Sequence, residues 1–158
     1  MRKDTRARMI DSILVVCTGN ICRSPLGEAL LRAGLAPSQI RVGSAGIGAL
    51  DGHPADETTR AVARANGLDL EAHVARQFTA QLGQAHSLIL AMAPAHRRAI
   101  TRDAPELSGR IMLFDHWTGA EGVPDPYRHA RAVHEAAFAR IATATTAWIG
   151  RLNPAVQP

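Results

Sequence analysis

A nucleophile and an anion-binding side chain lie six positions apart in this chain. Cys17 and Arg23 are joined by the segment Thr-Gly-Asn-Ile-Cys. A cysteine thiolate is a strong nucleophile, and an arginine guanidinium can hold two phosphate oxygens at once, which a lysine ammonium cannot do. Gly19 permits a tight turn, and Asn20 is one of the few non-glycine types that tolerate a positive φ. Residues 17–23 therefore predict a loop that holds an oxyanion beside a cysteine.

A buried strand and a helix are expected to position this loop. The apolar run Ile-Leu-Val-Val at 13–16 predicts a strand that is covered on both faces, as in a parallel sheet. Ser24 is a favourable N-cap and Pro25 a favourable first helical residue, and apolar residues then recur at helical spacing. The free amides at the start of that helix would point back at Cys17, which favours both a bound oxyanion and a thiolate.

A second chemical element is the segment Gly-Val-Pro-Asp-Pro-Tyr at 122–127. The two prolines that flank Asp125 stiffen the loop and fix the direction of the carboxyl group. A rigid acid suits a reaction in which the leaving oxygen must receive a proton. Taken alone, a Pro-Asp-Pro sequence is more often a simple turn.

Together, these two elements resemble the low-molecular-weight protein tyrosine phosphatase family. The loop reads Cys-Thr-Gly-Asn-Ile-Cys-Arg-Ser-Pro over 17–25, and Asp-Pro-Tyr follows at 125–127. The resemblance covers roughly residues 12–152, and within the family the chain is most similar to bacterial members that are paired with tyrosine autokinases in exopolysaccharide export. Further segments resemble this bacterial branch in order, at 43–46, 73–77, 87–92 and 111–117.

The resemblance implies a hydrolysis of phosphotyrosine in two steps, without a metal or other cofactor. Cys17 would attack phosphorus and form phosphocysteine, and Arg23 would hold the equatorial oxygens. Asp125 would protonate the tyrosyl oxygen and then take a proton from the attacking water. The remaining residues implied to bind the substrate are Thr18, Gly19, Asn20, Ile21, Cys22, Ser24 and Tyr127.

Supporting roles are also implied by the resemblance. Ser24 would donate a hydrogen bond to the Cys17 sulfur, and Asn20, Ser44 and His73 would brace the loop. Tyr127 would stack on the substrate ring. Plainer alternatives stay open, because His73 could be a surface histidine and Tyr127 could simply pack its own loop.

Cys22 has two interpretations, a small buried filler or a resolving thiol that forms a reversible disulfide with Cys17, as the resemblance implies. Trp117 and Trp148 are expected to be packing residues. The other histidines show no metal-ligand spacing and are expected to be surface or structural residues; they are His53, His86, His96, His116, His129 and His134. One cleft wall should be aliphatic, because Ile-Gly-Ala-Leu at 47–50 lacks the aromatic residue of the vertebrate enzymes.

Composition favours a single cytoplasmic domain. The chain has 158 residues, of which 46% are hydrophobic, and no apolar run approaches the roughly 20 residues of a membrane span. Residues 1–9 carry +3 of the formal +4 charge and are expected to form a disordered basic extension before a phosphatase domain at 10–158. The nearly neutral remainder argues against a nucleic acid partner. The expected partner is a phosphotyrosine protein, specifically a tyrosine autokinase.

Strand and helix patterns alternate along the chain. Short apolar runs predict strands at 39–45, 87–92 and 110–114, and helical patterns cover 56–65, 94–102 and about 129–149. This order predicts a three-layer, doubly wound α/β fold with a four-stranded parallel sheet flanked by helices. The phosphate-binding loop would follow the first strand, at the carboxyl edge where such sheets bind ligands.

Two other functions remain open. An arsenate reductase would use the same fold and a similar anion loop, but a thioredoxin-coupled relay needs a further cysteine pair, and no cysteine follows Cys22. A glutathione-dependent variant would avoid that requirement. A non-catalytic phosphotyrosine-binding module would use the same loop without turnover, although Cys17, Arg23 and Asp125 are all present.

Overall fold

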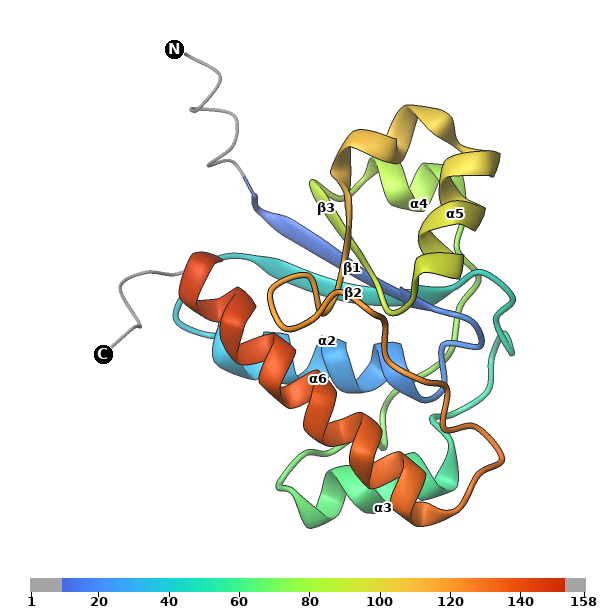
Figure 1. The fold of residues 1–158 in the computed structure, drawn as a ribbon, viewed down its shortest axis with the longest axis vertical. Helices are drawn as coiled ribbons and strands as arrows, with labels where there is room; N and C mark the ends of the chain where they lie inside the picture. The colour runs from blue at the N-terminus through green and yellow to red at the C-terminus, as the bar shows by residue number, and fades with distance from the viewer. Residues whose placement is uncertain (1–9, 153–158) are drawn as a thin grey trace.

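A computed structural model describes residues 10–152 of the chain, so the predicted extension at 1–9 lies outside the described residues. Four parallel strands form one sheet in the order β2-β1-β3-β4 (Figure 1). This arrangement confirms the predicted α/β fold. The elements in chain order are β1 (Ser12–Cys17), α2 (Arg23–Gly34), β2 (Arg41–Gly46), α3 (Glu57–Ala65), α4 (Ala80–Gln84), β3 (Leu88–Ala91), α5 (Pro94–Asp103), the 3-10 helix η1 (Pro105–Arg110), β4 (Ile111–Leu113) and α6 (Arg131–Leu152).

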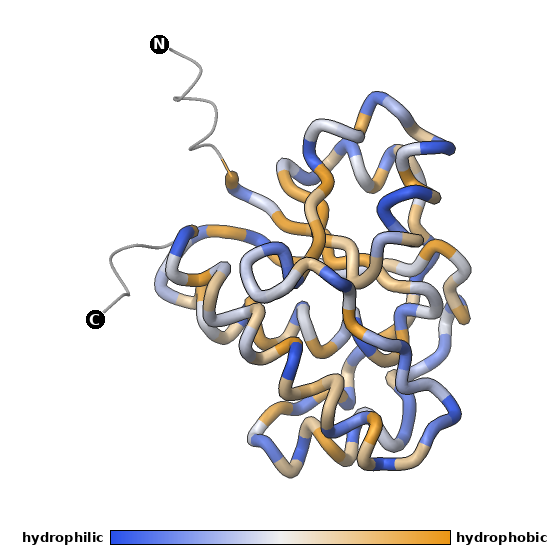
Figure 2. Tube along the Cα trace, in the orientation of Figure 1, coloured by the Kyte–Doolittle hydropathy of each residue, from blue (hydrophilic) through white to orange (hydrophobic). Residues whose placement is uncertain are grey.

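Successive side chains of β1 point to opposite faces of the sheet, and each face carries its own hydrophobic cluster. Ile13 and Val15 belong to the cluster that α2 and α6 cover. Leu14 and Val16 belong to the other cluster, which α5 and η1 cover. Figure 1 shows the helices on the two sides of the sheet, and Figure 2 shows hydrophobic stretches along the strands and hydrophilic turns on α5. None of the helices described is long and apolar enough to cross a membrane.

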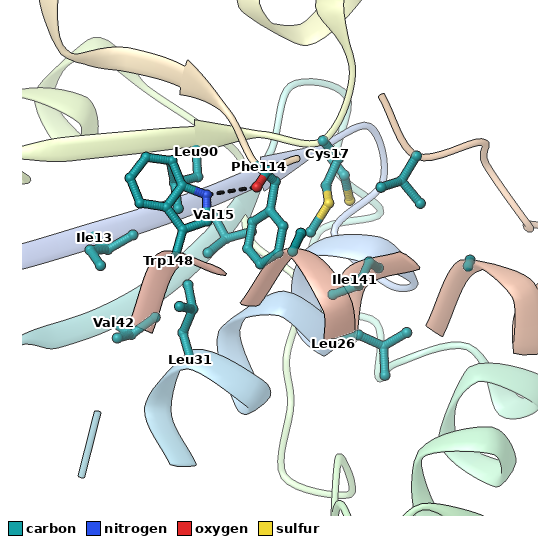
Figure 3. Packing of buried hydrophobic residues seen from close by; sticks show 14 of the residues in the cluster. Ile13, Val15, Cys17, Leu26, Leu31, Val42, Leu90, Phe114, Ile141 and Trp148 are labelled. Atoms are coloured by element: carbon teal, nitrogen blue, oxygen red, sulfur yellow. Dashed lines mark hydrogen bonds between the residues drawn. The ribbon is translucent and has the colours of Figure 1, made fainter. Parts of the chain in front are cut away.

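The core beneath α6 contains a buried polar contact. The Trp148 indole Nε1–H donates to the Phe114 carbonyl oxygen at 2.6 Å (Figure 3). Phe114 is fully buried and Trp148 is nearly so. The hydrogen bond therefore satisfies the only donor of the buried indole ring. Trp148 is therefore a packing residue, as predicted, whereas Trp117 is 41% exposed and has the Arg151 guanidinium over its ring.

Helix α2 begins earlier than its sequence predicts. Arg23 is its first residue and Cys22 occupies the N-cap position without a capping side-chain hydrogen bond, so the prediction of Ser24 as N-cap is wrong. The Ser24 hydroxyl instead lies 3.0 Å from the Cys17 sulfur, where a tertiary contact replaces the local cap. The short helices α4 and η1 were not predicted from the sequence pattern.

Candidate active site

The loop between β1 and α2 surrounds the sulfur of Cys17. Cys17 is the last residue of β1, in register with Gly46 of β2, so the loop leaves the carboxyl edge of the sheet. The Ser24 backbone N–H donates to Cys17 Sγ at 3.4 Å, and the Ser24 hydroxyl lies 3.0 Å from the same atom. A Cβ on Gly46 would collide with the Thr18 carbonyl oxygen, so this strand position requires glycine for the loop to approach.

A cleft of about 160 Å³ opens over this loop. It brings together most of the residues that the sequence predicts for catalysis and binding. Its lining consists of Cys17, Thr18, Gly19, Ile21, Cys22, Arg23, Gly48, Leu50, Asp125 and Tyr127. Asn20, Ser24, Ser44 and His73 do not line it but lie behind the loop. Leu50, which is 37% exposed, and Gly48 give the aliphatic wall predicted for 47–50.

Arg23 lies buried in the wall of the cleft. Its Nη1 donates to the Val123 carbonyl oxygen at 2.9 Å, and its Nη2 donates to Thr18 Oγ1 at 3.4 Å. The Nε atom has no hydrogen-bond partner within residues 10–152. Since buried donors are normally satisfied, the guanidinium retains capacity to bind an oxyanion in the cleft.

Asp125 lies at the mouth of the cleft. Its side chain is 49% exposed, and its Oδ2 lies 3.6 Å from Arg23 Nη2. The Tyr127 backbone N–H donates to Asp125 Oδ1 at 3.0 Å. This bond closes a turn and fixes the direction of the carboxyl group. A carboxyl group held at this position can exchange a proton with a ligand bound beside Arg23.

Asn20 connects the back of the loop to three other segments. It is fully buried and has a φ of 59°, the left-handed conformation that the sequence suggested. Its Nδ2 donates to Ser24 Oγ at 2.7 Å and to Ser44 Oγ at 3.0 Å, while its Oδ1 accepts from the Arg76 backbone N–H at 2.9 Å. The ring Nε2 of His73 lies 2.7 Å from the Asn20 carbonyl oxygen. The structure therefore brings Ser44 and His73 to the loop.

The network extends to two residues to which sequence reasoning assigned no role. The Ser44 hydroxyl donates to Glu28 Oε1 at 2.5 Å, and the Arg76 Nε–H donates to the Ser44 carbonyl oxygen at 2.9 Å. Glu28 lies on α2, one turn after Ser24. Its helical spacing from Ser24 is the sequence signal that could have placed Glu28 next to the loop.

His96 is a further site residue that sequence reasoning missed. It is buried near the start of α5, and its Nε2 lies 2.8 Å from Thr18 Oγ1. Burial lowers the pKa of His96 to about 4, and the Arg23 guanidinium lowers it as well, against the opposing effect of Asp125. The ring is therefore neutral at physiological pH. The parallel topology was the available signal, because the helix after β3 begins at the same sheet edge as the loop.

Cys22 lies on the other side of the loop as a free thiol, and Cys17 is free as well. Burial raises the pKa of Cys22 to about 12, the Asp56 carboxylate acts in the same direction, and a hydrogen bond with Thr59 opposes the shift. Cys22 packs in a small cluster with Ile21, Ala75 and the half-buried Tyr127. Tyr127 therefore both lines the cleft and packs its own surroundings.

Comparisons with known proteins agree with this geometry. The family model described as low molecular weight phosphotyrosine protein phosphatase matches residues 12–157. The protein-tyrosine-phosphatase Etp of Escherichia coli K12 is 45% identical over 143 residues, which cover 90% of this chain and 95% of that protein. Wzb of Salmonella typhimurium is 45% identical, with 92% of this chain and 96% of that protein covered. The crystal structure of the tyrosine phosphatase Wzb from Escherichia coli K30 with sulphate has a TM-score of 0.89 at 44% identity, and covers 92% and 100% of the two chains.

Proposed function

The chain belongs to the low molecular weight phosphotyrosine protein phosphatase family, and from this premise we propose how its own residues hydrolyse phosphotyrosine. The observation that carries the proposal is the placement of Cys17, Arg23 and Asp125 in one small cleft. A nucleophile, an anion clamp and an acid are the three groups that hydrolysis of a phosphate monoester through a covalent intermediate requires.

In the first step the Cys17 thiolate attacks the phosphorus of phosphotyrosine. A sulfur–phosphorus bond forms as the bond from phosphorus to the tyrosyl oxygen breaks, and Asp125 gives its proton to that oxygen. Arg23 and the loop amides hold the equatorial oxygens, whose charge is spread further in the transition state. The amides belong to residues 18–23.

In the second step water hydrolyses the phosphocysteine. Asp125, now a carboxylate, takes a proton from the water as its oxygen attacks phosphorus. The sulfur–phosphorus bond breaks, and the sulfur leaves as a thiolate. The Ser24 hydroxyl at 3.0 Å supports this step because it can donate a hydrogen bond to the leaving sulfur.

The walls of the cleft favour an aromatic leaving group. Ile21 and Leu50 give apolar surface, and Tyr127 offers a ring against which a second ring can stack. An aryl phosphate places its phosphate at the loop and its ring between these walls. Phosphotyrosine on a protein has that shape.

We further propose that the physiological substrate is a tyrosine autokinase of exopolysaccharide production and that the protein acts in the cytoplasm. The support is the resemblance of the chain to bacterial phosphatases paired with such kinases, together with its 45% identity to the tyrosine phosphatase Wzb of Salmonella typhimurium. Incubation of the purified phosphatase with phosphorylated autokinase from the same organism tests this part. Loss of the phosphotyrosine signal is expected, and a signal that persists while a small aryl phosphate is hydrolysed would contradict it.

Hydrolysis of para-nitrophenyl phosphate at mildly acidic pH, with a chelator present, tests the mechanism. The native protein should turn over, and Cys17→Ser should not, because a serine hydroxyl stays protonated at this pH and is a much weaker nucleophile than a thiolate. Arg23→Lys should keep the charge but lose bidentate binding, and therefore most of the activity. Activity in Cys17→Ser would reject a phosphocysteine intermediate.

A further inference from the structure

A second group of side chains with ligand chemistry lies next to the catalytic loop. It consists of Cys22 at the N-cap of α2, Asp56 at the N-cap of α3 and His134 on α6. Their nearest sulfur, oxygen and nitrogen atoms all lie within 4.8 Å of one another. The side chains of these residues take no part in the two hydrolytic steps, so the mechanism does not explain their convergence.

Thr59 contacts all three members of this group, because it also makes a hydrogen bond with Cys22. Its hydroxyl lies 3.1 Å from His134 Nδ1, and its backbone N–H donates to Asp56 Oδ2 at 3.1 Å. With Nδ1 engaged, the other ring nitrogen of His134 faces the carboxylate, and its Nε2 lies 3.9 Å from Asp56 Oδ2. A histidine that binds a metal commonly has its second nitrogen held by a polar partner in this way.

Burial makes this group costly without a compensating charge. Cys22 and His134 are each 3% exposed, whereas the Asp56 side chain is 20% exposed and connects the group to solvent. The His134 Nε2 atom lies 3.9 Å from Asp56 Oδ2, beyond hydrogen-bond distance. A cation between the three side chains would engage the sulfur, the Nε2 atom and a carboxylate oxygen together.

We propose that Cys22 Sγ, the Asp56 carboxylate and His134 Nε2 form a binding site for one divalent cation with the ligand preference of zinc. Sulfur, imidazole nitrogen and carboxylate oxygen are the three donor types that zinc takes in proteins, and water can complete a tetrahedron. Zinc–ligand distances of about 2.0–2.3 Å place such donors roughly 3.3–3.6 Å apart, so the group must contract by about 1 Å. Small rotations of all three side chains must supply this movement.

Binding at this site exchanges a proton for the metal without electron transfer. The sulfur–hydrogen bond of Cys22 breaks, a sulfur–metal bond forms, and the proton passes to solvent. One thiolate and one carboxylate balance the two charges of the cation, so the buried centre is neutral. The site is separate from the phosphate site, but it shares Cys22 with the loop and would hold residues 21–23 in place.

Cobalt(II) spectroscopy on the Cys17→Ser protein tests the proposal. The chain has two cysteines, so in this variant Cys22 is the sole thiol. When Co²⁺ is added to the reduced, chelator-treated protein, we expect a near-ultraviolet thiolate-to-cobalt absorption band that saturates at one equivalent and disappears when Zn²⁺ is added. Absence of the band at saturating Co²⁺ would overturn the proposal.

Variants of the other two ligands locate the site. In the Cys17→Ser background, His134→Phe fills the buried volume without a ligand nitrogen, and Asp56→Asn keeps the helix cap without the charge. Each should weaken Co²⁺ binding more than tenfold. His129→Phe, at an exposed histidine in the same part of the chain, is the matched control and should leave binding unchanged.

Folding of each variant is checked by circular dichroism and its thermal midpoint. If His134→Phe does not fold, the Co²⁺ affinity of the Asp56→Asn variant alone decides whether the three side chains form the site. A thiolate band of unchanged affinity in either folded variant would show that Cys22 binds metal without this group, and the proposal would fail.

Discussion

Asp125 Oδ2 and Arg23 Nη2 lie 3.6 Å apart in the cleft, the first on a half-exposed side chain and the second on a buried one. A phosphate that binds the guanidinium therefore arrives directly beside the carboxyl group. In the proposed mechanism the two groups divide the chemistry, because Arg23 would hold the phosphate oxygens while Asp125 would exchange a proton with the bridging oxygen. The Arg23 Nη1 bond to the Val123 carbonyl oxygen, two residues before Asp125, ties the guanidinium to the segment that carries the carboxyl group.

The substitution Asp125→Asn tests the assignment of the acid. The amide would keep the side-chain oxygen that accepts from the Tyr127 N–H but would have no acidic proton to give. Turnover of para-nitrophenyl phosphate should fall by about 10²–10⁴-fold, the range for loss of a general acid, while inhibition by inorganic phosphate should change little. Asp51→Asn, at an exposed acid, is the control. An unchanged turnover number would remove Asp125 from its assigned role.

Two substitutions at Asn20 separate its side chain from its backbone. Both Asn20→Ala and Asn20→Gly lose the bonds to Ser24, Ser44 and the Arg76 N–H, whereas only alanine is strained at a φ of 59°. Urea unfolding should show that both variants are less stable than the native protein. The unfolding free energy of the alanine variant should be about 1 kcal/mol lower than that of the glycine variant. If glycine restored full stability, the hydrogen bonds would contribute nothing.

His96 should make stability depend on pH. Its pKa is lowered to about 4 in the folded protein, against about 6.5 in an unfolded chain. The contribution of the neutral ring is therefore complete above pH 6.5 and is lost as the pH falls toward 4. Between pH 7 and pH 4 the native protein should lose on the order of 3 kcal/mol more unfolding free energy than His96→Asn does, measured by urea unfolding. Parallel pH profiles for the two proteins would contradict this.

Leu50 should act on substrate binding more than on chemistry. Leu50→Ala removes apolar wall area that an aryl ring would cover, so the KM for para-nitrophenyl phosphate should rise about fivefold, corresponding to about 1 kcal/mol of lost contact. The turnover number should stay within about twofold, because Leu50 carries no group that acts on the phosphate. A fall in turnover at constant KM would indicate that Leu50 positions the loop instead.

Trp148→Phe should affect stability without affecting the site. The variant loses the indole N–H and leaves the buried Phe114 carbonyl oxygen without that donor, which costs about 1–3 kcal/mol. Its thermal midpoint should fall, while kcat and KM at 25 °C should stay at native values. An activity loss in the folded variant would mean that the core beneath α6 communicates with the cleft.

Much of the fold could be predicted because the decisive signals are local. The apolar run before Cys17 predicted β1, and the apolar stripe after 129 predicted α6. Asp56, whose carboxylate accepts from the Thr59 N–H, marks the start of α3 where the pattern placed it. Ser24 shows the limit, because its local preference for an N-cap yields to a contact with the Cys17 sulfur.

The missed site residues share a different property. The missed residue His96 lies 78 positions from its partner Thr18, and the missed Asp56 and His134 approach the predicted Cys22 from the N-cap of α3 and from α6. Sequence spacing and periodicity do not predict such long-range contacts, because these contacts depend on where the sheet order places each helix. Of the implied supporting residues, Ser44 and His73 do reach the loop, whereas their effect on catalysis stays a prediction.

The bonds that close around Asn20 have a kinetic consequence. Its partners Ser44, His73 and Arg76 lie 24 to 56 positions further along the chain, so these bonds form only when distant segments have met. Closing such long loops costs chain entropy and comes late relative to local helix formation. Catalytic competence should therefore be the last property that a refolding chain recovers, and a partly folded chain would carry its thiol without the means to use it.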